Sequence, residues 1–85
     1  MNLKRRSLED YFILANFHDL LPLATQIADN MGYDKFEMAE AICKVHSKFQ
    51  EYPPRYNRTA WFSTVFKEKL VEARGDILSY KANRG

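Results

Sequence analysis

The stretch NRTAWFSTVFKEKLVEARG, residues 57–75, decides the fold of this chain. Asn57 is a favoured N-cap residue, and the apolar side chains after it recur at spacings of three and four, the period of one helix face. Those side chains are Trp61, Phe62, Val65, Phe66, Leu70 and Ala73. The stretch therefore predicts an amphipathic helix that begins after Asn57. It ends at Gly75, or it continues toward Tyr80 at the cost of a glycine in its interior.

Two shorter helices are expected near the N-terminus. Ser7 can cap a helix over residues 8–16, because its hydroxyl accepts a hydrogen bond from an exposed N–H group of the first turn. Pro22 is tolerated only in a first turn, so a second helix should begin two or three residues before it. Gly32 suits the left-handed residue that ends such a helix.

A third helix, residues 35–51, is expected at the centre of the domain. Asp34 and Glu37 form a capping-box pattern at its start, and the consecutive prolines 53 and 54 cannot continue it. Its apolar residues at helical spacing are Phe36, Ala39, Ile42, Cys43, His46 and Phe49, with Met38 and Val45 widening the stripe to two sides. Such a helix is typically buried between neighbours.

Length and composition set the fold class. A chain of 85 residues holds one domain, and 46% hydrophobic and 14% aromatic residues suffice for one core. Three glycines and three prolines provide few turns for an all-β chain. We therefore expect a single all-α domain, a compact bundle of four or at most five helices. Residues 1–6 form a flexible basic N-terminus and residues 81–85 a frayed tail in this prediction.

Cysteine content and hydropathy bear on location. Cys43 is the single cysteine, so an internal disulfide is excluded and a reducing compartment is indicated. No apolar run approaches the roughly 20 residues that cross a bilayer. We expect a cytoplasmic protein without a membrane partner.

Catalysis and metal binding have little support in the sequence. Cys43, His46 and His18 are the only soft ligands, and the paired spacings of a four-ligand zinc site are absent. Cys43 lies within the apolar stripe of the third helix, so we expect it to be buried and inert. No glycine-rich loop could hold a phosphate. The sequence predicts no enzyme, cofactor, metal site or small-molecule substrate.

The aromatic density of the helix after Asn57 predicts a protein-binding surface. Its side chains cover more than one narrow face, and a four-helix domain this small is not expected to bury all of them. An apolar patch with an aromatic anchor is the usual sign of a protein–protein or homodimer interface. The residues expected to bind a partner or a second copy are Trp61, Phe62, Val65 and Phe66.

Two basic segments are candidates for contact with nucleic acid. In the connection before the last helix, arginines that can pair with phosphate alternate with tyrosines that can stack on bases. A basic run near the N-terminus could contact a DNA backbone. A plain interhelical connection and a solvated terminus are the alternatives. The residues concerned are Arg55, Tyr56, Arg58, Lys4, Arg5 and Arg6.

A short family resemblance falls on the last helix. The segment Asn57-Arg58-Thr59-Ala60-Trp61-Phe62, followed by Val65, Phe66, Lys69 and Leu70, resembles one near the C-terminus of replication initiators and replisome organisers of Gram-positive plasmids and phages. Those proteins often carry a small helical C-terminal domain related to the DnaD family. The resemblance implies a helical module for primosome assembly that self-associates, contacts initiator or helicase-loading proteins and, in some members, binds DNA.

The function expected from these observations is that of a non-catalytic helical adaptor in plasmid or phage DNA replication. It would bind a replication protein or itself through the aromatic residues of the last helix. The alternative is a small DNA-binding regulator of transcription or copy number, with the third and fourth helices as a helix-turn-helix-like pair. The net charge of +2 is too small to favour strong non-specific binding to DNA.

Overall fold

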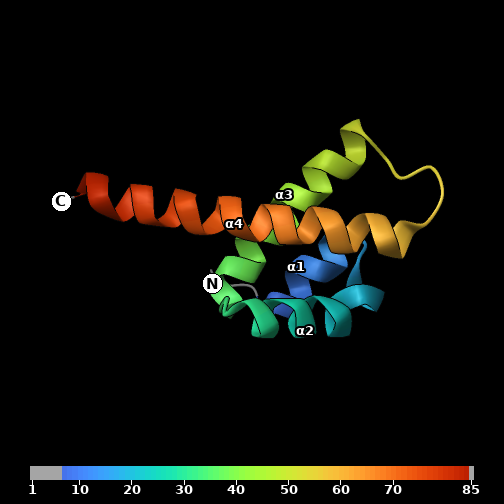
Figure 1. The fold of residues 1–85 in the computed structure, drawn as a ribbon, viewed down its shortest axis with the longest axis horizontal. Helices are drawn as coiled ribbons and strands as arrows, with labels where there is room; N and C mark the ends of the chain where they lie inside the picture. The colour runs from blue at the N-terminus through green and yellow to red at the C-terminus, as the bar shows by residue number, and fades with distance from the viewer. Residues whose placement is uncertain (1–6, 85) are drawn as a thin grey trace, which may run out of the picture.

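Helix α3 lies at the centre of the computed structural model of this chain (Figure 1). The structure describes residues 7–84, and it describes side chains as far as residue 80. Helices α1 and α4 pack against α3, and α2 packs against both α3 and α4. The predicted all-α, single-domain fold with four helices is confirmed for the described residues. In chain order the elements are α1 (Leu8–Leu14), the 3₁₀ turn η1 (His18–Leu20), α2 (Leu21–Met31), α3 (Lys35–Glu51) and α4 (Arg58–Arg84).

Capping residues set the helix ends, as the sequence predicted. Ser7, Asp34 and Asn57 each accept a hydrogen bond from the backbone N–H three residues further on, at 3.2, 2.8 and 2.9 Å. Gly32 follows α2 with a φ of 79°, the left-handed conformation that favours glycine. Three helix starts and one helix end are therefore explained by local chemistry.

Two helix ends differ from the prediction. Helix α1 ends at Leu14, before residue 16, because Asn16 adopts a φ of 66° and turns the chain away. Helix α4 continues through Gly75 to Arg84, so it extends into the segment for which the sequence predicted a frayed tail. The C-terminal half of α4 extends past the other helices in Figure 1. The predicted flexible basic segment, residues 1–6, lies outside the described residues.

Aromatic rings fill much of the space between the helices. The ring of Phe17, in the turn after α1, lies 5.1 Å from that of Phe62 and 5.4 Å from that of Phe49, measured between centroids. Phe62 in turn stacks on Phe66 at 5.1 Å, and Phe12 meets Phe66 edge-on at 6.1 Å. Such ring pairs add about 0.5–1.5 kcal/mol to the free energy of burial. The largest fully buried side chains are Phe12, Phe17, Phe62, Phe66, Ile42, Leu70 and Val45.

This packing overturns the prediction that the aromatic residues of α4 form an exposed protein-binding surface. Phe62 and Phe66 have no exposed area, and Val65 is buried. Trp61 is half-buried, with its ring 5.6 Å from that of Phe49. The physical reason is that rings from α1, α3 and the turn before η1 converge on this part of α4. A domain of this size does bury nearly all of the cluster.

The polar composition of the helices bears on membrane insertion. Within residues 7–84, no helix is both long enough and apolar enough to cross a bilayer. Helix α4 has the length, but charged residues recur along it.

Candidate functional site

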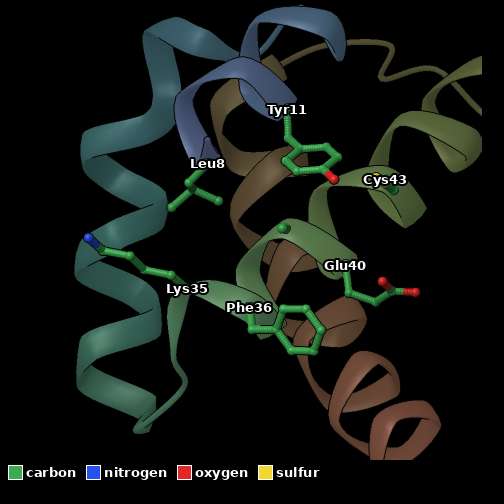
Figure 2. A pocket seen from close by; sticks show the side chains of 7 residues that line it. Leu8, Tyr11, Lys35, Phe36, Glu40 and Cys43 are labelled. Carbon is green, nitrogen blue, oxygen red and sulfur yellow. The ribbon is translucent and has the colours of Figure 1, made fainter. Parts of the chain in front are cut away.

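An open apolar groove lies between α1 and the N-terminal half of α3 (Figure 2). Its volume is about 420 Å³, within the range of pockets that accept a ligand or a partner's side chain. Figure 2 shows Leu8 and Tyr11 projecting from α1 toward the face of α3 that carries Phe36. The residues that line the groove are Leu8 and Tyr11 of α1, and Lys35, Phe36, Ala39, Glu40 and Cys43 of α3.

Phe36 is the most informative residue of this groove, because 69% of it is exposed to solvent. Its helical spacing predicted that Phe36 belongs to the buried apolar stripe of α3, and that prediction is wrong. The core face of α3 carries Met38, Ile42 and Val45, and Phe36 in the first turn points away from it. An exposed phenyl ring beside an apolar groove is a common feature of docking surfaces.

Cys43 is also exposed, contrary to the prediction that it is buried. Its thiol nevertheless lies in the groove, and partial burial raises its pKa above the usual value, with the nearby carboxylate of Glu40 adding to the effect. The thiol therefore stays protonated near neutral pH and is a slow nucleophile. Because it is the single cysteine of the chain, it provides a specific chemical probe of this groove.

Two opposite charges flank the exposed ring. Figure 2 shows Lys35 and Glu40 extending to opposite sides of Phe36. Neither side chain forms an ion pair or a side-chain hydrogen bond with another described residue. Many other charges of the described residues form ion pairs, although Asp29, Glu51, Arg55 and Lys67 also stand outside these pairs. Those pairs include Lys44 with Asp76, Lys48 with Glu68, Lys69 with Glu72, Arg58 with Asp19 and Arg74 with Glu37.

Arg74 and Glu37 fix the start of α3 against α4. The Arg74 guanidinium donates to both carboxylate oxygens of Glu37, at 2.6 and 2.9 Å, and to the carbonyl oxygen of Gly32 at 2.9 Å. It also lies 4.0 Å from the centroid of the Tyr33 ring. These hydrogen bonds lower the pKa of the Glu37 carboxyl, which is only 8% exposed. These contacts join the turn before α3, next to Phe36, to α4.

From the sequence, Glu37 was predicted only to cap α3. Its side chain does accept from the N–H of Asp34 at 2.9 Å, which completes the capping box. Its pairing with Arg74 spans 37 residues of chain, and no local pattern indicates such a contact. The sequence contains one indication of the groove. Apolar residues occur on two sides of the third helix, and each side needs a packing partner in order to be buried. The core covers one side, and part of the other side is left open.

Arg58, a predicted nucleic-acid residue, makes its contacts within the domain. Its guanidinium donates to the Asp19 carboxylate at 2.9 and 3.3 Å and to the carbonyl oxygen of Asn16 at 2.6 Å. It also lies 4.6 Å from the centroid of the Phe17 ring. The hydrogen bond from Arg58 lowers the pKa of the Asp19 carboxyl. This arginine therefore joins the start of α4 to η1 and has little remaining capacity for a phosphate.

The other predicted nucleic-acid residues have different outcomes. Arg55 and Tyr56 are exposed in the connection between α3 and α4, and Tyr56 is 95% exposed. Lys4, Arg5 and Arg6 lie outside the described residues. The structure therefore does not bring the six predicted residues together into one described surface.

Within the described part of the chain, no three side chains of His, Cys, Asp or Glu are arranged to hold a metal ion. His18 pairs instead with Glu9, at 2.9 Å. The chain matches no model of a protein family, no curated protein and no solved structure.

Proposed function

We propose that this chain is a non-catalytic helical binding module that acts in the cytoplasm as an accessory protein of plasmid or phage DNA replication. The observation that supports a binding role is the exposed ring of Phe36 at the edge of the α1–α3 groove. The replication setting rests on the resemblance of Asn57 to Leu70 to helical domains of replication initiators.

The groove supplies the parts that a docking surface needs. Apolar side chains form its walls, Phe36 stands beside it as an aromatic anchor, and the small side chain of Ala39 leaves room between them. A partner inserts an apolar side chain of a helix there, in the manner of a helix that binds in a groove. Lys35 and Glu40 then select a partner with complementary charges on either side of that side chain.

Docking through the aromatic residues of α4 is not part of this proposal. Phe62 and Phe66 are fully buried, so a partner could reach them only by opening the core. The residues that carry the resemblance contribute to folding, through the cap at Asn57 and through these rings.

Binding to candidate partners tests the proposal. The protein is titrated with purified replication initiators and helicase-loading proteins of Gram-positive plasmids and phages, and heats of binding are compared for the unaltered chain, Phe36→Ala and the control Tyr56→Ala. Tyr56 is exposed on a different surface, so it controls for the loss of an exposed aromatic ring. Binding that Phe36→Ala weakens and Tyr56→Ala preserves supports the proposal. Binding to none of these proteins, or equal effects of both variants, contradicts it.

The second candidate is a DNA-binding regulator, which the exposure of Arg55 and Tyr56 beside the start of α4 favours. The pairing of Arg58 with Asp19 counts against it. Measuring duplex DNA binding across a salt series tests this candidate. A steep fall of affinity with salt, reduced by Arg55→Ala, would favour a regulator over an adaptor.

A further inference from the structure

We infer that a second copy of this chain occupies the α1–α3 groove, so that the protein forms a two-fold symmetric dimer through the N-terminal half of α3. This inference deepens the proposed function by naming a second copy as an occupant of the groove, for which a replication protein would compete, and it rests on that function in taking the groove as the docking surface. Its support is that the groove and its surroundings are complementary to themselves, as a two-fold interface must be.

The first element of this self-complementarity is shape. One patch carries both an exposed aromatic side chain, Phe36, and an apolar groove of about 420 Å³ beside it. A two-fold axis places the Phe36 ring of each copy against the groove of the other. The groove walls from Leu8 and Tyr11 then cover a ring that is 69% exposed in the single chain.

The second element is the order of residues along α3. Phe36, Ala39 and Cys43 follow one another at spacings of three and four, which are those of the a and d positions between paired helices. Ala39 lies in the middle of the three, and its small side chain lets two helices approach closely. These residues thus form a short seam on the outer face of α3.

The third element is charge. Lys35 precedes the seam at a g position and Glu40 lies within it at an e position. In a parallel pair of helices, a g residue faces the e residue of the partner five positions further on. The two-fold axis therefore pairs Lys35 of each copy with Glu40 of the other. These are the two charges of the groove that have no ion-pair partner among the described residues.

Sedimentation velocity on the unaltered protein over a wide concentration range tests the inference directly. We expect a monomer–dimer equilibrium that Phe36→Ala weakens by roughly tenfold or more, as for a central aromatic anchor. The control Tyr56→Ala should leave the equilibrium unchanged. A chain that remains monomeric at all concentrations, or a dimer that Phe36→Ala does not weaken, would overturn the inference.

Exchanging the charges of Lys35 and Glu40 distinguishes this dimer from one that forms through another surface. Lys35→Glu or Glu40→Lys alone places like charges together and should weaken association, whereas the double variant restores opposite charges and should recover it. Lys35 is the first residue of α3, where an acidic side chain favours the helix dipole, so Lys35→Glu should not destabilise the monomer. Weaker association with unchanged folding stability is thus expected. Single variants that associate normally, or a double variant that does not recover, would contradict the pairing.

Alkylation of Cys43 locates the interface. The thiol lies in the groove, so its rate of alkylation at fixed pH should fall as the dimer forms and should rise again in Phe36→Ala. A dimer that leaves this rate unchanged would lie elsewhere and would refute the inference. These measurements use the protein alone, so their failure is distinguishable from a failure to bind replication proteins.

Discussion

Phe62→Ala is expected to destabilise the domain by about 3–5 kcal/mol, the cost of truncating a fully buried phenylalanine. The ring stacks on Phe66 and lies tilted against Phe17, each at 5.1 Å, so its removal leaves a cavity between helices that cannot close without moving α4. A domain of 85 residues has a free energy of unfolding of roughly 4–13 kcal/mol. If the stability lies at the lower end of that range, the variant is unfolded.

The matched change is Phe36→Ala, which removes the same ring from a site that is 69% exposed. Its cost in the monomer should lie within about 0.5 kcal/mol. Phe62→Leu serves as a second core variant that retains the fold, because it removes less volume and should cost roughly 1–2 kcal/mol.

Urea unfolding measures all three variants, followed by helical circular dichroism and by the fluorescence of Trp61, the single tryptophan. The protein is kept dilute so that association does not contribute. With a slope of about 1 kcal/mol per molar urea, Phe62→Leu should lower the midpoint by about 1–2 M, and Phe36→Ala by less than about 0.5 M. A cost below about 1 kcal/mol for Phe62→Ala would refute the core assignment of this ring.

Three further outcomes are expected. Gly32→Ala should destabilise the domain by about 1 kcal/mol because Gly32 has a positive φ. Gly75→Ala should stabilise the domain by up to about 1 kcal/mol, because Gly75 lies inside α4 with open space around it. Thermal unfolding should show a lower melting temperature for the first variant and a higher one for the second. Arg58→Ala should lower the urea midpoint and Arg55→Ala should not, since of the two only Arg58 forms hydrogen bonds with other described residues. The pKa of Glu37 is lowered in the folded state, so its contribution to stability is present above the ordinary value of 4.5 and is lost as the pH falls through the lower folded value. Glu37→Gln should therefore reduce the fall of the free energy of unfolding with decreasing pH in the acid range. An unchanged fall in this variant would contradict the pairing of Glu37 with Arg74.

Helix positions could be predicted from the sequence because their determinants are local. Ser7, Asp34 and Asn57 act on N–H groups three residues away, and Gly32 ends its own helix. Each of these effects needs only neighbouring residues, so a single sequence reveals them.

Which aromatic faces are buried could not be predicted in the same way. The helical period puts Phe62 and Phe66 on one face, but their cover comes partly from Phe17, in a turn that has no periodic pattern. The same limit applies to Phe36. Phe36 lies in one of two apolar stripes of α3, and the spacing alone does not reveal that the core takes the other stripe, which carries Met38 and Val45.

A map of backbone amide chemical shifts over a protein concentration series tests the central claim, that the docking surface is the α1–α3 groove. We expect concentration-dependent shifts concentrated at residues 8–11 and 35–43, and their loss in Phe36→Ala. Shifts concentrated at residues 52–61, or no shifts at any concentration, would contradict it.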